Sequence, residues 1–182
     1  MKEEYAPDMA VVFPARKRRD GLPEWLFIRK LRKIGVGKWN GPGGVANPKE
    51  APRRAASREL REELGLIAHP LSLMLVAIVD STTQETERLT VKNRVWFYFA
   101  WEWTGTPVPA PSEVAEPTWF KEVPSHDDLM PGDPFWLPRV FSGERLHVKV
   151  PYGPGRTALA GPVETSMIPY SLTLLDRILY HP

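Results

Sequence analysis

Acidic side chains gather in one short segment of the chain, at Glu50, Glu59, Glu62 and Glu63. The last three stand at i, i+3 and i+4, so on a helix they project from one face. Like charges at these spacings repel each other unless a cation lies between them. A hard divalent ion such as Mg²⁺, with Mn²⁺ as an alternative, prefers oxygen ligands and is commonly shared with substrate phosphates. The spacing therefore predicts a metal-dependent phosphate site.

The segment that carries these glutamates is predicted to be a helix. Pro52 suits a first-turn position, and Gly65 predicts a left-handed stop directly after Leu64. Most residues between them are good helix formers. Ala56 and Leu60 form an apolar stripe with Leu64 that should be buried, which leaves the glutamates facing outward into a site.

A glycine-rich turn, residues 40–44 with the sequence NGPGG, precedes this helix. Glycine allows the backbone to approach a ligand closely, so this turn can meet a phosphate or offer a carbonyl oxygen to a metal. Gly43 and Gly44 are the residues that we expect to do so.

Residues 44–66 resemble the Nudix box, G-x5-E-x7-R-E-U-x-E-E-x-G-U with U an aliphatic residue, and every specified position is filled. The resemblance implies a Nudix hydrolase with an α/β (α+β) fold, the α/β/α sandwich built on a mixed β-sheet. It also implies Mg²⁺ as the cofactor and a nucleotide as the substrate. A charged helix that merely faces solvent is the alternative, because that is what most segments rich in Glu and Arg form.

The same resemblance assigns roles to the acidic residues of the box. Glu59 and Glu63 are expected to bind Mg²⁺, with Gly43 and Gly44 beside them. Glu62 either shares a metal or acts with Glu63 in accepting the proton of the attacking water, and the sequence does not divide these roles.

Two further roles follow from the resemblance. Arg58 is expected to orient the glutamates through charge-assisted hydrogen bonds. A carboxylate from outside the box is usual among the metal ligands of the family. Glu113 is the preferred residue for that role here, and Glu116 is the alternative.

Short segments outside the box are similar to the animal oxidised-purine nucleoside triphosphatases, a MutT-like branch of the family. These segments are residues 35–41, 119–120, 130–138 and 167–172. The resemblance implies that Asn40 hydrogen-bonds the purine, for which an amide that both donates and accepts is suited. Asn40 could equally be a turn residue before glycine. Lys30 falls where the branch has a pocket lysine, and Trp136 is included in the expected substrate-binding set.

The chain departs from that branch at residues 130–133, where a tryptophan, a proline and two aspartates are replaced by MPGD. Met130 is expected to cover a base face through its polarisable sulfur. Asp133 either reads the base or caps a helix. With Gly132 in place of an aspartate, discrimination between oxidised and ordinary purines should be weaker, and Gly132→Asp should sharpen it.

Composition agrees with a single domain over residues 1–182. An apolar share of 42% and a charged share of 25% are ordinary for a globular protein. The net charge of +2 is too small to favour a nucleic-acid partner, although the basic run at residues 16–19 keeps a capped RNA end among the alternatives. Without cysteine the chain has no disulfide or thiolate metal site. No signal-peptide pattern or membrane span is recognisable, so we expect a cytoplasmic protein without a membrane partner.

The rest of the chain is predicted to form strands around the acidic helix. Residues 9–13 and 25–28 should form a hairpin, and residues 71–79 and 93–103 two longer strands joined by a polar, mobile connection over 80–90. The remaining predictions are a strand at 118–122, a helix at 133–142 capped by Asp133 and ended by Gly143, a strand at 146–150, a loop at 152–163 and a return to the sheet at 167–175.

Three functions agree with these features. The first is a Mg²⁺-dependent hydrolase that converts a purine nucleoside triphosphate, including an oxidised one such as 8-oxo-dGTP, to monophosphate and pyrophosphate. The second is a hydrolase of the same family acting on a dinucleoside polyphosphate, a nucleotide sugar or a capped RNA end. The third is a nucleotide sensor that does not catalyse a reaction, which the intact acidic set disfavours.

Overall fold

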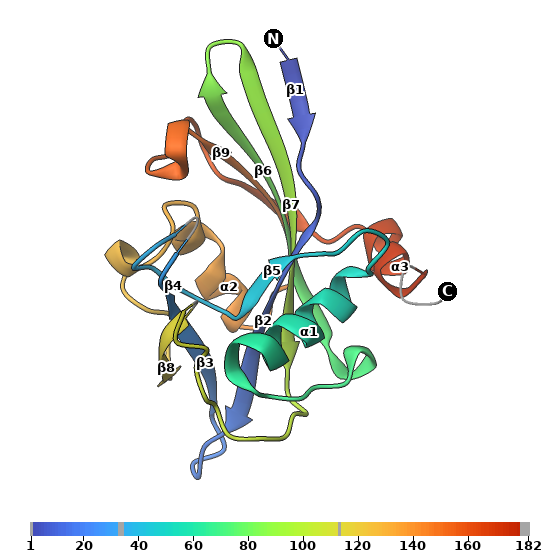
Figure 1. The fold of residues 1–182 in the computed structure, drawn as a ribbon, viewed down its shortest axis with the longest axis vertical. Coiled ribbons are helices and arrows are strands. Elements are labelled where there is room, and N and C mark those ends of the chain that lie inside the picture. The colour runs from blue at the N-terminus through green and yellow to red at the C-terminus, as the bar shows by residue number, and fades with distance from the viewer. Residues whose placement is uncertain (1, 33–34, 113, 179–182) are drawn as a thin grey trace.

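The computed structural model of the protein describes residues 2–32, 35–112 and 114–178. Its described strands form one mixed sheet in the order β10-β9-β6-β7-β2-β3-β4, with β1 also paired to β7, β5 to β2 and β8 to β3 (Figure 1). The strands are β1 (Lys2–Tyr5), β2 (Met9–Lys17), β3 (Pro23–Lys30), β4 (Trp39–Asn40), β5 (Gly43–Val45), β6 (Met74–Thr86), β7 (Leu89–Ala100), β8 (Val114–Phe120), β9 (Leu146–Tyr152) and β10 (Glu164–Met167).

Helices cover both faces of this sheet. The helices are α1 (Pro52–Leu64), α2 (Leu137–Phe141) and α3 (Tyr170–Ile178), with 3₁₀ turns η1 (Pro70–Ser72), η2 (His126–Asp128), η3 (Asp133–Phe135) and η4 (Pro154–Arg156). None of the helices within the described ranges is both long enough and apolar enough to span a membrane.

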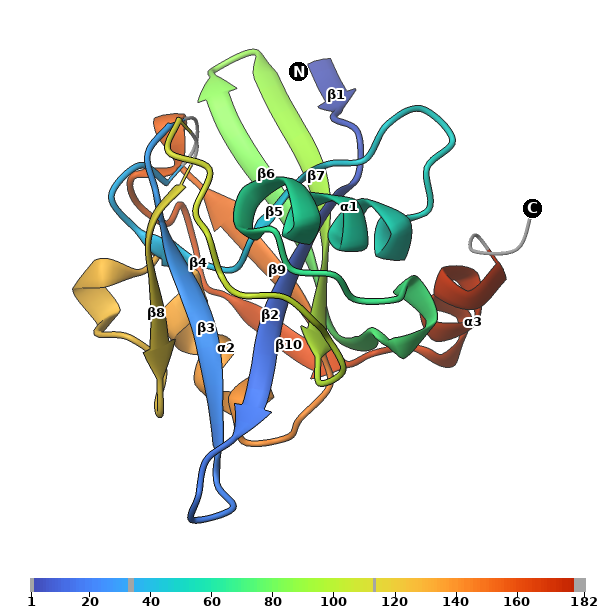
Figure 2. The same ribbon diagram turned by 60° about the horizontal axis from the view of Figure 1, so that its bottom comes forward.

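Strand β2 separates the two hydrophobic cores because its side chains alternate between the faces of the sheet. Ala10 and Val12 join the core beneath α1, whereas Val11 and Phe13 join the core beneath α2. Helix α1 lies across β2, as Figure 2 shows. This arrangement is the sandwich with a mixed sheet that the sequence predicted, and the predicted fold class is confirmed.

Helix α1 has the predicted boundaries. Pro52 occupies its first turn, and Gly65 follows it in the left-handed conformation at φ 69°. The Gly65 amide donates to the Arg61 carbonyl, which closes the last turn. Leu60 and Leu64 are fully buried beneath the helix. The helix is therefore fixed by its caps and by one apolar face, as its sequence indicates.

The predicted hairpin of β2 and β3 is confirmed, with Ala15 opposite Trp25. The predicted loop over 80–90 is wrong. Strand β6 continues to Thr86 and β7 begins at Leu89, so only two residues make the turn of a long hairpin that extends beside β1 (Figure 1). The reason is that the polar stretch contains β-branched threonines, such as Thr82 and Thr83, which favour strands.

The predicted return of residues 167–175 to the sheet is also wrong. Strand β10 ends at Met167, and α3 begins at Tyr170, directly after Pro169. Leu172 and Leu175, at helical spacing, pack against the core beneath α1. The apolar composition of the segment would also suit a strand, but its apolar residues recur at the spacing of one helix face, and the segment forms a helix.

The predicted helix at 133–142 is divided into η3 and α2. Asp133 is not its cap, because no side-chain cap hydrogen bond exists at the start of either piece. Gly143 follows the last helical turn at φ 108°, as predicted. The Asp133 side chain is therefore available for another role.

A buried ion pair holds α3 against the rest of the protein. Asp176 is 1% exposed and accepts hydrogen bonds from both Nε and Nη2 of Arg53, which lies on α1. The Tyr98 hydroxyl on β7 donates to the same carboxylate at 2.7 Å. Burial and the neighbouring carboxylate raise the pKa of Tyr98 well above its usual value, so the phenol stays a donor. One carboxylate thus ties together α1, β7 and α3.

Candidate active site

A cavity of about 570 Å³ opens between α1, the glycine-rich strands and the central sheet. Of the residues predicted to act in the site, ten line this cavity: Lys30, Asn40, Gly43, Gly44, Arg58, Glu59, Glu62, Glu63, Met130 and Asp133. The fold therefore brings the phosphate-directed residues and the base-directed residues into one space.

Gly43 and Gly44, beside the acidic helix, lie very close to neighbouring atoms. A Cβ atom at Gly44 would lie 2.5 Å from Oε1 of Glu59, and one at Gly43 would collide with the Ala10 carbonyl on β2. Strand β5 can therefore pass beside β2 only with glycine at position 43, whereas a side chain at position 44 would displace the Glu59 carboxylate.

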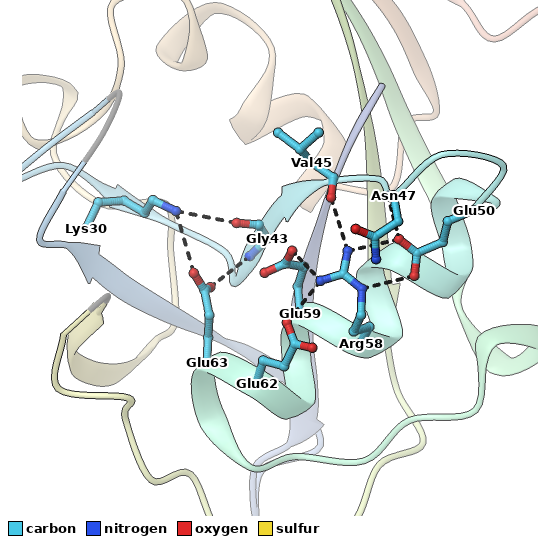
Figure 3. Close-up of polar contacts among 9 residues, drawn as sticks. All are labelled: Lys30, Gly43, Val45, Asn47, Glu50, Arg58, Glu59, Glu62 and Glu63. Atoms are coloured by element: carbon cyan, nitrogen blue, oxygen red, sulfur yellow. Dashed lines mark hydrogen bonds and ion pairs between the residues drawn. The ribbon is translucent and has the colours of Figure 1, made fainter. Parts of the chain in front are cut away.

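Glu63 is buried beside this strand, with 2% of its surface exposed. Its Oε2 accepts a hydrogen bond of 2.9 Å from the Gly43 amide. The Lys30 ammonium lies 3.7 Å from Oε1 of Glu63 and donates to the Gly43 carbonyl at 3.4 Å (Figure 3). A cation therefore lies between a carboxylate and a carbonyl that were both predicted to bind metal.

Arg58 organises the other carboxylates of the box. Its Nη1 lies 2.7 Å from Glu59 Oε1 and 2.9 Å from Glu62 Oε2, while Nε and Nη2 bind both oxygens of Glu50 (Figure 3). The Glu50 carboxylate also accepts a hydrogen bond of 2.8 Å from the backbone N–H of Asn47. The hydrogen bonds that Arg58 donates to Glu50 lower the pKa of that carboxyl group, and its hydrogen bonds to the three glutamates raise the pKa of Arg58 itself. This network of hydrogen bonds ties α1 to the preceding loop.

The acidic residues do not converge on one point. Within the described residues, no three side chains of the metal-binding types lie close enough together to hold an ion by themselves. The like charges of α1 were expected to need a metal between them, and in this structure Arg58 and Lys30 supply the positive charge instead. The donors nevertheless suit a hard cation, because the cavity wall offers carboxylate oxygens and the Gly43 carbonyl already holds an ammonium group.

Of the two glutamates predicted as metal ligands from outside the box, only one lies within the described residues. Glu113 lies outside the described residues. Glu116 is exposed, does not line the cavity, and pairs with Arg29 at 3.2 Å. The structure therefore does not place Glu116 among the other predicted ligands.

The base-directed residues lie on the cavity wall formed by β4 and the 130–133 segment. Asn40 accepts the Gly41 amide at 2.8 Å through its Oδ1, so it does act as a turn residue while lining the cavity. Its amide nitrogen is the group that remains to donate to a ligand. Met130 is half-buried on the same cavity wall.

The carboxyl group of Asp133 has a raised pKa. The residue is 8% exposed, and burial raises the pKa of its carboxyl group to about 7. The indole of Trp136 acts in the opposite direction, although its N–H has no hydrogen bond of standard geometry among the described residues. Near neutral pH the Asp133 carboxyl can thus donate as an acid or accept as a carboxylate.

Trp136 is placed differently from its prediction. It is fully buried, packs on the ring of Phe97 with 4.9 Å between centroids, and does not line the cavity. It packs in the same hydrophobic core as the apolar residues of α2. Trp136 therefore supports the wall of the cavity and does not face its interior.

Gly132 cannot accept the aspartate that was expected to sharpen base preference. A Cβ atom there would lie 2.6 Å from Val150 Cγ1 and 2.9 Å from the Tyr152 hydroxyl. Tyr152 therefore fills the space into which a side chain at position 132 would point. Gly132→Asp should disturb the packing of β9 before it could contribute a carboxylate.

Several cavity residues were missed by the sequence analysis. Tyr152 and Arg156 enter the cavity from the end of β9 and from η4, and Ser81 and Asn93 enter it from β6 and β7. The segment 152–163 was predicted only as a loop. The one local signal is the cationic side chain of Arg156 after two glycines and a proline, which by itself does not indicate a site.

Residues 7–133 match the NUDIX domain family. The chain belongs to the Nudix family. It is similar to the oxidized purine nucleoside triphosphate hydrolase of Mus musculus, with 34% identity over 126 residues that cover 66% of this chain and 74% of the relative. The corresponding Danio rerio protein is 33% identical over 123 residues, with the same coverage of both chains.

Solved Nudix structures agree with the fold. A MutT protein from Bacillus halodurans superposes with a TM-score of 0.70 over 90% of this chain and 100% of its own, at 19% identity. A MutT Nudix hydrolase from Burkholderia pseudomallei gives a TM-score of 0.53 over 72% of this chain and 95% of its own, at 25% identity. The predicted resemblance is confirmed, and the protein is an enzyme of the Nudix hydrolase family, acting on pyrophosphate bonds.

Proposed function

We propose that this Nudix hydrolase cleaves purine nucleoside triphosphates, oxidised forms included, to the monophosphate and pyrophosphate with Mg²⁺. The proposal is carried by one observation, which is that the box glutamates and the base-directed Asn40, Met130 and Asp133 line a single cavity. The names of the mouse and zebrafish relatives support the same substrate class. A single domain over residues 1–182 and a cytoplasmic location belong to this proposal as predictions from the sequence.

The phosphate end of the cavity supplies the groups that hydrolysis requires. Glu59, Glu62 and Glu63, with the Gly43 carbonyl, would hold Mg²⁺, which screens the phosphate charge and lowers the pKa of bound water. Arg58 orients Glu59 and Glu62 through hydrogen bonds to both carboxylates. The Glu62 side chain is 51% exposed and is therefore the carboxylate that water reaches most easily, whereas Glu63 is fixed by the Gly43 amide.

Product analysis in ¹⁸O-labelled water tests the proposed reaction. Attack at the β-phosphorus breaks its bond to the α-phosphate oxygen, so the label should enter pyrophosphate and none should enter the monophosphate. Mass spectrometry of both products after a single turnover provides the measurement. Orthophosphate as the primary product, or label in the monophosphate, would contradict the proposal.

The protonation of Asp133 provides a prediction about pH. Because its folded pKa of about 7 lies above the ordinary value of 3.8, the folded protein binds a proton that the unfolded chain releases between these two values. This contribution to stability is therefore present at low pH and is lost as the pH rises towards 7. Across the same range the carboxyl changes from hydrogen-bond donor to acceptor.

We expect the purine-to-pyrimidine ratio of kcat/KM to change across pH 7 in the wild type and to be flat in Asp133→Asn. Asn40→Ala should lower kcat/KM for the preferred purine at any pH in this range, since it removes a partnered polar group. The loss should correspond to about 1 to 3 kcal/mol of transition-state stabilisation. Asp127→Asn, in the exposed turn η2, provides the matched control. An unchanged pH profile in Asp133→Asn would mean that Asp133 does not contact the base.

A further inference from the structure

One end of the cavity is rich in hydrogen-bond donors. Arg156 lies there with its guanidinium half-buried, 5.9 Å over the ring of Tyr152. Its Nε donates to the Thr83 hydroxyl at 2.9 Å, and its Nη2 donates to Oδ1 of Asn93. These neutral acceptors fix the plane of the guanidinium. Within the described part of the chain, Arg156 forms no ion pair with a carboxylate.

The position of Arg156 is costly for the protein. Burial lowers the pKa of its guanidinium, outweighing the opposite effects of Tyr152 and Glu85. Its backbone is left-handed at φ 57°, which is an unfavourable conformation for a residue other than glycine. A partly desolvated cation on a strained turn, whose hydrogen bonds within the described residues go only to the neutral Thr83 and Asn93 side chains, is suited to bind a ligand.

Two hydroxyl groups lie on the same wall. Ser81 is 4% exposed, and its hydroxyl has no hydrogen-bond partner among the described residues. The Tyr152 hydroxyl lies beside the Gly132 backbone, which hydrogen-bonds it and thereby opposes the upward shift that burial gives its pKa. If that amide donates to the Tyr152 oxygen, its O–H remains to donate elsewhere. Both side chains line the cavity together with Arg156.

The chemistry of this end selects among bases. A guanidinium has five N–H donors and no acceptor, so it pairs with a carbonyl oxygen and rejects an amino group. Purines differ in this respect: guanine and hypoxanthine carry an oxygen at position 6, adenine carries an amino group there, and oxidised purines carry a further oxygen at position 8. Asp133, which also interacts electrostatically with Tyr152, can serve an adjacent N–H of an oxo-purine.

We propose that Arg156, supported by Tyr152 and Ser81, makes this enzyme selective for purines that present an exocyclic carbonyl oxygen over purines that present only an amino group. The inference deepens the proposed function, because it names which purines the same cavity accepts. The apolar side chains of Met9, Val95 and Met130 line the same cavity and can cover the faces of a flat ring.

Binding of nucleoside monophosphates tests this selectivity without requiring turnover. dIMP and dAMP differ only at position 6 and the adjoining N1, whereas 8-oxo-dAMP and dAMP differ only at position 8 and the adjoining N7. Titration calorimetry should give at least about tenfold tighter binding of dIMP, 8-oxo-dAMP or both than of dAMP to the wild type. The pair that shows the preference identifies which oxygen Arg156 binds.

Substitutions then assign the preference to the side chain. Arg156→Gln, whose amide both donates and accepts, should bring the ratio close to one, while Arg156→Lys, still a donor only, should keep most of it. Arg88→Gln, an exposed arginine in the β6–β7 turn, makes the same change outside the cavity and should match the wild type. Thermal melting of each variant identifies any loss that comes from unfolding, and Tyr152→Phe offers a second, smaller change at the same end.

The possible outcomes separate this inference from the proposed function. Equal affinity of the wild type for all three nucleotides overturns the inference, even if the enzyme hydrolyses purine triphosphates. A uniform loss of affinity in Arg156→Gln also overturns it, because that pattern indicates contact with the phosphate or the sugar. Preference for the oxo-purines without any triphosphate hydrolysis would instead overturn the proposed reaction and leave the selectivity standing.

Discussion

Replacing Glu63 with glutamine should lower kcat by roughly 10² to 10⁴, the range seen when a central catalytic group loses its charge. Glu63 is nearly buried and is fixed by the Gly43 amide, so its carboxylate cannot be replaced by a mobile neighbour. An amide of the same shape can still accept that hydrogen bond, and the fold should survive. What it loses is the negative charge that now attracts the Lys30 ammonium and that would bind Mg²⁺.

The measurement is steady-state hydrolysis of a purine triphosphate over a range of Mg²⁺ concentrations, with thermal melting alongside. Glu122→Gln makes the same chemical change on an exposed residue outside the cavity and should have near wild-type activity. Near wild-type turnover of Glu63→Gln at saturating Mg²⁺ would show that α1 does not provide the metal site.

Replacing Asp176 with alanine should destabilise the protein by about 3 to 5 kcal/mol. The substitution removes the carboxylate from a guanidinium that is 7% exposed and from the hydroxyl of the fully buried Tyr98. Desolvation makes the loss of a buried ionic partner far more costly than the loss of a surface ion pair. Denaturant unfolding followed by circular dichroism measures the change in the free energy of unfolding.

Two other substitutions separate the ionic contribution from the rest. Tyr98→Phe removes one charge-assisted hydrogen bond to the same carboxylate but leaves the ion pair in place, so it should cost about 1.5 to 3 kcal/mol. Glu144→Ala breaks the exposed ion pair with Arg139 and should cost far less, because water and salt screen such a pair. A loss in Asp176→Ala no larger than that in Glu144→Ala would refute the idea that this ion pair holds α3 in place.

The acidic helix could be predicted from sequence because everything that determines it is local. Pro52, Gly65 and the spacing of Leu60 and Leu64 lie within one short segment, and each acts on its own turn of backbone. The box spacing also indicated which carboxylates would share a cavity. The resemblance to the box also assigned Arg58 to orient the glutamates, and Arg58 does hydrogen-bond both Glu59 and Glu62.

The features that the sequence could not provide depend on contacts between distant segments. Residues 167–175 are rich in strand-forming side chains, and the helix there is secured by Asp176, whose partner Arg53 lies 123 positions away. The burial that shifts the pKa of Asp133 likewise arises only in the folded protein. Tyr152 and Arg156 form part of the site because β9 pairs with β6, which no local pattern reveals.

The pairing of β2 with β7 has a consequence for how the enzyme is made. These strands run parallel, with Met9 opposite Val95, so the pairing closes a loop that contains all of α1. Closing so long a loop costs entropy before the contacts that reward it exist, and folds with many distant pairings form slowly. A nascent chain that has emerged only as far as Leu66 carries the entire box but lacks β6, β7 and β9. The catalytic helix should therefore remain without its cavity until β9 and Arg156 have been synthesised, and a shorter nascent chain should not hydrolyse nucleotides.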